Sequence, residues 1–218
     1  MAIDVLTKDC AGLGDADFAE MADLVASTVG WEAGMLSKEA EEWVLASQAY
    51  EKDKLRGFML TTLERIGGTP ALVIGIASVA RTKQRSPVLK ALMHESYHKA
   101  LMAFPDEDVI VACRMIEPGP LEMLGELTGV RPWPDERANG EERAWGRRLA
   151  KRFGAIAFDD RTMIAKGDGE RLVFDHESTK PCEGAAVLDR CDTDDAEYVI
   201  VWGWAMAEFL EKYQTPLG

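Results

Sequence analysis

The stretch Ala71-Leu-Val-Ile-Gly-Ile-Ala-Ser-Val-Ala80 decides the fold, because the segments on either side of it define its neighbours in a sheet. Its continuous apolar character, bounded by turn residues before it and basic residues after it, is typical of a buried strand. A second strand-like run covers residues 57–64, and Gly67-Gly68-Thr69-Pro70 lies between the two. We therefore predict an antiparallel hairpin. Gly75, inside the run, predicts a bulge or a close backbone approach.

A helix and a further strand follow this hairpin. Residues 89–104 place apolar side chains at three- and four-residue steps, which predicts a helix with one apolar face, and Pro105 ends it. Residues 109–116 form another apolar run. A strand, a helix and a strand within this length predict a βαβ unit, so strands 71–80 and 109–116 are expected to be parallel, with a right-handed crossover.

The rest of the chain is expected to complete one α+β domain over residues 1–218. Its predicted elements are a strand at 2–6, a helix between 15 and 30, a helix at 38–53 capped by Ser37, a basic helix at 141–153, strands at 171–174 and 198–204, and a helix at 205–213. No repeat or low-complexity linker divides the chain. We expect a mixed central sheet flanked by helices, with a core at 55–134 and a C-terminal elaboration at 135–218.

Composition limits the classes of function. The 38 Asp and Glu residues exceed the 25 Lys and Arg residues, so the formal net charge is −13, which argues against a nucleic-acid partner. No apolar run approaches the roughly 20 residues of a membrane span, and no charged-then-apolar signal segment opens the sequence. The four cysteines form no CxxC pair. We therefore expect a cytoplasmic protein with reduced thiols and no membrane partner.

The few basic residues are unevenly placed. Arg81, Lys83, Arg85 and Lys90 lie within ten residues that contain no acid, where a predicted strand leads through Ser86-Pro87 into a helix. A helix N-terminus, its macrodipole and nearby guanidinium groups favour a phosphate. A solvated basic loop explains the same cluster equally well. A second basic group, on the helix at 141–153, is expected to be solvated or paired with acidic segments of the chain.

The order of elements resembles the GNAT-type N-acyltransferase superfamily, most clearly over residues 55–134. The resemblance implies an acyl-CoA co-substrate, acetyl-CoA or another, bound where the two parallel strands splay apart. It places the pantetheine arm at Ala77, Val79 and Arg81, and the diphosphate at the residues of the following loop, Gln84, Arg85, Ser86 and Val88. That loop carries no glycine at the positions where the family has them. The chain therefore resembles a divergent member.

If the protein is catalytic, the resemblance implies transfer of the acyl group to a small amine, which needs a base. Glu117, at the end of the second parallel strand, is the candidate base, and Glu64 is a weaker second candidate. Each has an ordinary role open to it as well, Glu117 as an acid at a helix start and Glu64 as an exposed turn acid. The acidity of segments 15–53 and 135–197 hints at a cationic acceptor. Binding without turnover and a homodimer both remain open.

A competing motif is His94-Glu95-Ser96-Tyr97-His98, which matches the H-E-x-x-H pattern of zinc peptidases. Two histidines one helical turn apart share a face and are able to bind zinc, with Glu95 activating water. Lys99 follows directly, however, and both histidines lie beside an intact apolar stripe. We therefore keep a zinc peptidase as the third hypothesis and expect no metal. His176 is isolated in the sequence and is expected to face solvent.

Overall fold

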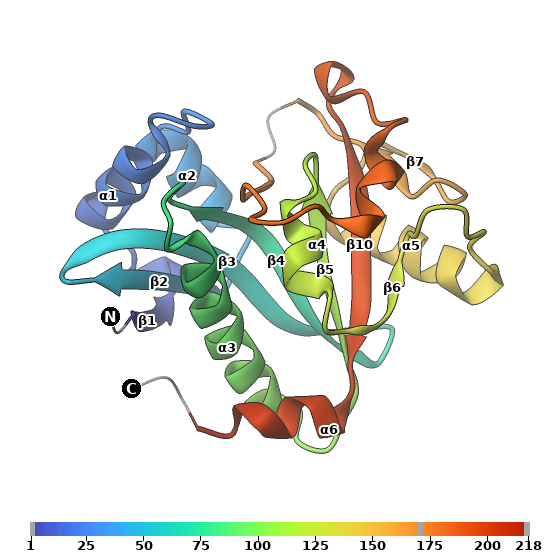
Figure 1. Cartoon of the computed structure of the whole chain (residues 1–218), viewed down its shortest axis with the longest axis horizontal. Helices are drawn as coiled ribbons and strands as arrows, with labels where there is room; N and C mark the ends of the chain where they lie inside the picture. The colour runs from blue at the N-terminus through green and yellow to red at the C-terminus, as the bar shows by residue number, and fades with distance from the viewer. Residues whose placement is uncertain (1–2, 170–171, 216–218) are drawn as a thin grey trace.

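A ten-stranded sheet runs through the described part of the chain, which is residues 3–169 and 172–215 of a computed structural model (Figure 1). The strands are β1 (Asp4–Asp9), β2 (Leu45–Glu51), β3 (Lys54–Ile66), β4 (Thr69–Val79), β5 (Val109–Met115), β6 (Thr128–Arg131), β7 (Ala157–Asp159), β8 (Ile164–Lys166), β9 (Phe174–Asp175) and β10 (Glu197–Ala205). The helices are α1 (Asp15–Val25), α2 (Ala33–Ala40), α3 (Arg85–Ala103), α4 (Gly119–Leu124), α5 (Gly140–Arg152) and α6 (Ala207–Leu210). Short 3-10 helices are η1 (Cys10–Gly12), η2 (Glu183–Leu188), η3 (Thr193–Asp195) and η4 (Glu211–Tyr213).

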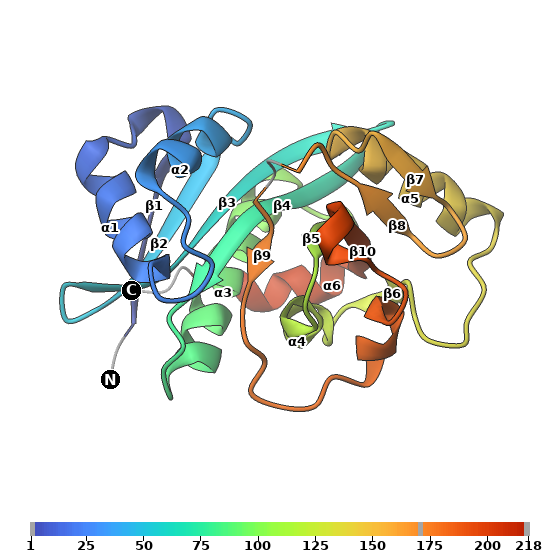
Figure 2. The same ribbon diagram turned by 90° about the horizontal axis from the view of Figure 1, so that it is seen from above.

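The sheet is mixed. Its strands follow the order β1-β2-β3-β4-β5-β10-β8-β7, with β6 on β10 and β9 on β4. Every pairing is antiparallel except β4 with β5 and β4 with β9. Helices α1 and α2 lie on one face, and α3, α4 and α6 lie on the other (Figure 2). The predicted α+β class, the antiparallel hairpin and the parallel βαβ unit are confirmed.

The predicted helix at 38–53 is wrong. Helix α2 has already ended at Ala40, and residues 45–51 form β2, which lies between β1 and β3. Most side chains of β2 are buried on both faces, so its apolar residues show no strict alternation. The turn into β3 uses Lys52 and Asp53 at positive φ of 50° and 61°, without the glycine that usually marks such a hairpin.

The hairpin and α3 form close to their predicted positions, whereas β7 and β8 were not predicted. Gly67 and Gly68, both at positive φ, make the turn between β3 and β4, and α3 fills the crossover from β4 to β5. The predicted strand at 171–174 overlaps β9, and its residue 171 lies outside the described residues. The basic helix, α5, uses its arginines as internal partners: Arg152 pairs with Glu64, and Arg147 pairs with Asp160.

No helix in the described ranges is long and apolar enough to cross a membrane.

Candidate functional site

The parallel strands β4 and β5 separate half-way along β4. They pair from Ala71 with Ile110 to Ile74 with Cys113, and the pairing stops there although β4 continues to Val79. Beyond that point Ala77 and Ser78 pair in parallel with Phe174 and Asp175, which are β9. Figure 2 shows β9 between the ends of β4 and β5. The opening expected between the parallel strands is therefore present, and a segment of this chain occupies it.

Gly75 marks the place where the strands separate. The pairing with β3 skips Gly75, since Leu60 faces Ile76 and Thr61 faces Ile74, so the residue is the predicted bulge. Its carbonyl oxygen accepts a hydrogen bond from the fully buried Arg114, at 3.2 Å. The approach of Trp43 is also close, because a Cβ on Gly75 would lie 1.9 Å from the indole ring. The bulge and the close approach to the backbone, the two alternatives predicted for Gly75, are both present.

The carboxylate of Asp175 is held by three donors on its partners. Ser78 Oγ donates to Oδ2 at 2.8 Å. Thr28 Oγ1, in the connection between α1 and α2, lies 3.2 Å from the same oxygen and 3.2 Å from the carbonyl oxygen of Val25, so these two acceptors share its one proton. Arg81 Nη2 donates to Oδ1 at 2.7 Å. Ser78 and Asp175 are almost completely buried. Charge-assisted hydrogen bonds to a buried carboxylate are among the stronger contacts in proteins.

Residues 174–180, which we call the 174–180 segment, continue from β9 across α3 and α4. The backbone N–H of His176 donates to Glu117 Oε1 at 2.8 Å, and Arg85 Nε donates to the carbonyl oxygen of Glu177 at 2.9 Å. Gly119 lets the segment pass, because a Cβ there would lie 1.7 Å from the carbonyl oxygen of His176. A side chain at position 119 would therefore clash with the backbone of the segment.

Glu122 of α4 is the main polar partner of this segment. Its carboxylate accepts hydrogen bonds from Ser178 Oγ at 3.1 Å, from the Thr179 N–H and Oγ1, both at 3.0 Å, and it lies 3.2 Å from His176 Nε2. Burial opposes the ionised form, but these donors and Ser86 outweigh it and lower the pKa of Glu122 to about 2. Burial lowers the pKa of His176, so its ring is neutral at pH 7.

Glu117 has the opposite electrostatic environment. Burial, and then the neighbouring carboxylate of Asp175, raise its pKa to about 7, although the His176 N–H and Arg81 act in the other direction. A carboxyl group whose pKa is close to the working pH is able to accept and release a proton there. Glu117 thus lies at the opening between β4 and β5, and its role as a base stays a prediction.

Comparison with known proteins finds distantly similar solved structures but no relative in sequence. No protein-family model matches the chain, and no curated protein matches it. Solved structures that are similar include the aminoglycoside 6'-N-acetyltransferase from Enterococcus faecium, at 16% identity and TM-score 0.37, over 51% of this chain and 61% of that one. Another is a GNAT-family acetyltransferase from Brucella melitensis in complex with acetyl-CoA, at 16% identity and TM-score 0.35, over 50% and 75%. A third, a GNAT-family acetyltransferase from Desulfovibrio desulfuricans, covers 92% of this chain and 98% of its own, at 13% identity and TM-score 0.43.

The chain has a GNAT-like fold. Its mixed sheet flanked by helices, with one parallel pair that separates along β4, is the architecture expected from the resemblance. In this GNAT-like fold, the edge of β4 at Ala77 and Ser78 carries β9.

The structure brings most of the predicted site residues to this opening. Ala77 pairs with β9, Arg81 and Arg85 bind the 174–180 segment, and Ser86 lies beside Glu122. The side chains of Val79 and Val88 are buried in the core, and Gln84 precedes α3 as its N-cap. The helix starts at Arg85 rather than after Ser86, because a tight turn from Thr82 to Arg85 leads directly into it.

Glu64 does not reach the opening. It pairs across β3 and β4 with Ala71, at the far end of β4 from Ser78, and its carboxylate accepts a hydrogen bond from Arg152 Nε. This ion pair joins the hairpin to α5.

Three residues of the site were missed by sequence reasoning. Asp175 and Thr28 stand in no recognisable motif, and His176, expected in solvent, is fully buried against Glu122. The only available signal was the short apolar run Leu-Val-Phe before Asp175, which is compatible with a strand. Nothing in that run indicates that its partner is β4.

The histidines of the H-E-x-x-H motif hold the C-terminal segment. His94 Nε2 lies 2.9 Å from the carbonyl oxygen of Thr215, and His98 Nδ1 lies 2.8 Å from that of Tyr213. Glu95 is buried, accepts a hydrogen bond from Thr7 Oγ1 and pairs with Lys99. Among residues 3–169 and 172–215, no group of three His, Cys, Asp or Glu side chains is placed to hold a metal ion.

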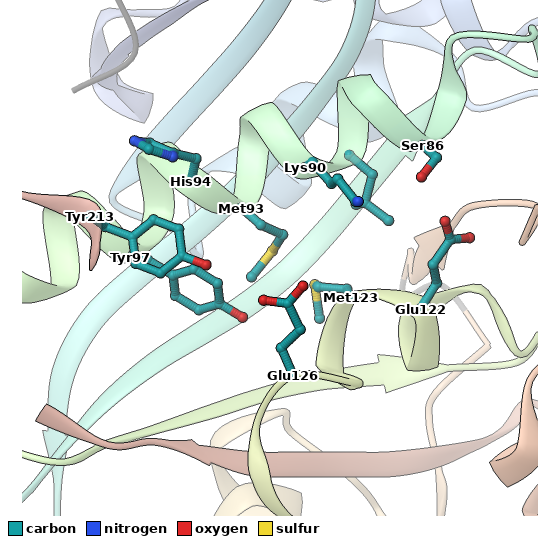
Figure 3. Close-up of a pocket in the computed structure, with 10 residues that line it drawn as sticks. Ser86, Lys90, Met93, His94, Tyr97, Glu122, Met123, Glu126 and Tyr213 are labelled. Atoms are coloured by element: carbon teal, nitrogen blue, oxygen red, sulfur yellow. The ribbon is translucent and has the colours of Figure 1, made fainter. Parts of the chain in front are cut away.

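A pocket of about 240 Å³ lies between α3 and α4 (Figure 3). Its lining residues are Ser86, Leu89, Lys90, Met93, His94, Tyr97, Glu122, Met123, Glu126 and Tyr213. Ser86 and Glu122 form the end beside the 174–180 segment, and Tyr97 and Tyr213 form the opposite end. The pocket therefore adjoins the occupied opening through Glu122.

Proposed function

We propose that the protein is an N-acyltransferase of the GNAT type, which moves an acyl group from acyl-CoA to a small amine at the opening between β4 and β5. The observation that carries the proposal is Glu117, with a pKa of about 7, beside the point where the parallel strands separate. The amine nitrogen attacks the thioester carbonyl carbon as Glu117 removes its proton. The C–S bond then breaks, and the thiolate leaves and is protonated.

The edge of β4 sets a condition on this reaction. The pantetheine amides expected at Ala77 need the backbone groups that now pair with Phe174 and Asp175. Acyl-CoA and β9 therefore compete for the same edge, and the 174–180 segment has to move before the thioester binds. Besides its hydrogen bonds, the segment makes ion pairs with Arg81 and Arg85, and Phe174 is fully buried in the core, so this movement has to withdraw an aromatic side chain as well as break the polar contacts.

The same pairing favours a second candidate function, a GNAT-like binding protein without turnover. If β9 stays on β4, the acyl-donor position remains filled by the chain itself. The pocket between α3 and α4 is then left as the open site for a ligand.

Titration calorimetry with acetyl-CoA, followed by thiol release with a panel of amines, separates the two functions. The proteins to compare are the wild type, Asp175→Ala, which weakens the hold on β9, and Asp195→Ala, a matched loss of an exposed acid that pairs with Lys166. The transferase predicts tighter acetyl-CoA binding by Asp175→Ala alone, with amine-dependent thiol release that Glu117→Gln abolishes. Binding without release favours the second candidate, and no binding by any variant overturns the transferase.

A further inference from the structure

The three donors around Asp175 make a site for a carboxylate. We call Thr28 Oγ1, Ser78 Oγ and Arg81 Nη2 the carboxylate site. These atoms lie 3.2, 2.8 and 2.7 Å, respectively, from the carboxylate oxygens of Asp175. They come from three separate parts of the chain: the α1–α2 connection, β4 and the loop after β4. Two hydroxyls and a guanidinium on both oxygens of one group satisfy a carboxylate in both charge and hydrogen bonding.

Binding of the thioester would empty this site. Because β9 and the acyl donor compete for the edge of β4, Asp175 leaves with its strand when the donor binds. The Ser78 hydroxyl, which is 1% exposed, and the Arg81 guanidinium then lose their partner. Where the acyl donor covers these groups in place of β9, an unsatisfied buried donor costs free energy, so a ligand that brings its own carboxylate to this position is favoured over one that does not.

The site also has the right neighbours for the acceptor. Thr28 lies in the connection between α1 and α2, whereas His176 meets Glu122 of α4. Glu117 is close enough to Asp175 for that carboxylate to raise its pKa. A carboxylate in the same place would keep Glu117 basic enough to accept a proton, and an ammonium group on the same small molecule would lie within reach of it.

On this basis, and resting on the proposed transferase function, we propose that Thr28, Ser78 and Arg81 bind the carboxylate of the acyl acceptor, and that Asp175 takes its place in the closed state. The acceptor is then an amino carboxylate rather than a simple cationic amine.

The first test asks only whether the site binds a carboxylate. Asp175→Ala leaves the three donors in place and makes room for acetate. At constant ionic strength, acetate is expected to raise the melting temperature of Asp175→Ala by about 3 °C, and neutral acetamide is expected to have no such effect. The wild type and Asp195→Ala should show no acetate-specific shift, and Arg81→Gln in the Asp175→Ala background should abolish it. The absence of a shift in Asp175→Ala, or an equal shift in the wild type, overturns the site.

The second test addresses the acceptor. Thiol release from acetyl-CoA is compared for pairs of amines that differ only in the carboxylate, such as β-alanine and ethylamine, or phenylalanine and phenethylamine. The amino carboxylate is expected to have a kcat/KM about tenfold higher or more, and Arg81→Gln should remove the difference. Equal or reversed preference overturns the acceptor assignment and leaves the transferase standing. Acetate binding without transfer to any amine overturns the transferase and its acceptor, and leaves the carboxylate site.

Discussion

Ser78 and Asp175 face each other across the parallel pair β4–β9, with Ser78 Oγ 2.8 Å from Asp175 Oδ2, although 97 residues separate them in the chain. Ser78 thus pairs with β9 through its backbone and also donates a side-chain hydrogen bond to it. Displacement of β9 therefore frees two things together, the edge for an acyl donor and the hydroxyl of the carboxylate site. On the proposed function, this single pair would link the closed and open states of the opening.

Gly119→Ala is expected to release the 174–180 segment. The new Cβ would lie 1.7 Å from the carbonyl oxygen of His176, which is backbone and has to move. We expect a loss of stability of roughly 2 kcal/mol and faster hydrogen exchange within residues 174–180. Gly12→Ala, where no atom lies within 4 Å of the added Cβ, is the control. Unchanged exchange in Gly119→Ala would show that the segment is not held at this point.

Glu122→Gln is expected to weaken the same segment in a manner that depends on pH. The pKa of Glu122 is lowered to about 2 in the folded protein, so its charge stabilises the fold above the ordinary pKa of 4.5. That contribution is lost as the pH falls from about 4.5 towards 2. The wild type should exceed the variant by about 2 kcal/mol at pH 7, with the difference shrinking at pH 3. Denaturant melts at both values measure it, and a gap independent of pH would contradict this origin.

The part of the fold predicted from sequence is the part with regular local signals. Strands β3 and β4 are apolar runs joined by a glycine turn, and apolar residues recur at three- and four-residue steps along α3. Such signals act over a few residues, so they are visible without knowledge of the rest of the chain. They were sufficient to predict the hairpin, the parallel pair and the bulge at Gly75.

Strand β2 was not predicted because its pairing with β1 and β3, rather than a local sequence pattern, determines its conformation. It lies between β1 and β3 with side chains buried on both faces, so Trp43, Ala46 and Tyr50 fit a helical stripe as well as a strand. Its turn, at Lys52 and Asp53, adopts positive φ with residues that do not signal it.

The sequence predicted only those site residues that lie at the ends of regular elements. Glu117, Arg81 and Arg85 follow from their places at element ends, which a sequence shows directly. Asp175 and His176 reach the site through a strand of two residues, and what fixes that strand is its partner on β4. Pairing over such a separation leaves no local pattern. The closure of the opening therefore became known only from the structure.

Gly75→Ala tests the bulge that separates β4 from β5. Its Cβ would lie 1.9 Å from Cε2 of Trp43, whose ring is buried, and the ring has little room to move. We expect a loss of about 3 kcal/mol or more in the free energy of unfolding. Gly34→Ala, in α2 with no atom within 4 Å of the new Cβ, should gain about 0.5 kcal/mol instead. Urea melts of the two variants make the comparison, and a mild effect at Gly75 would mean that Trp43 is not tightly packed.

Glu117→Gln tests the raised pKa on which the proposed base depends. Burial, and then Asp175, raise the pKa of Glu117 to about 7, above its ordinary value of 4.5. The folded protein therefore holds an extra proton between these values, and its stability falls as the pH rises through pH 7. Glutamine does not titrate, so the variant should be more stable than the wild type by about 2 kcal/mol at pH 8 and lose that advantage near pH 4.5.

The matched control for this measurement is Glu41→Gln, which removes an exposed carboxylate just after α2. Its stability curve should run parallel to that of the wild type between pH 4.5 and 8. Asp175→Asn supplies the second arm, because loss of the neighbouring charge should lower the pKa of Glu117 and move the pH at which Glu117→Gln gains its advantage to a more acidic value. Parallel curves for Glu117→Gln and the wild type would mean that folding does not raise the pKa of Glu117, and the base would then have to be sought elsewhere in the opening.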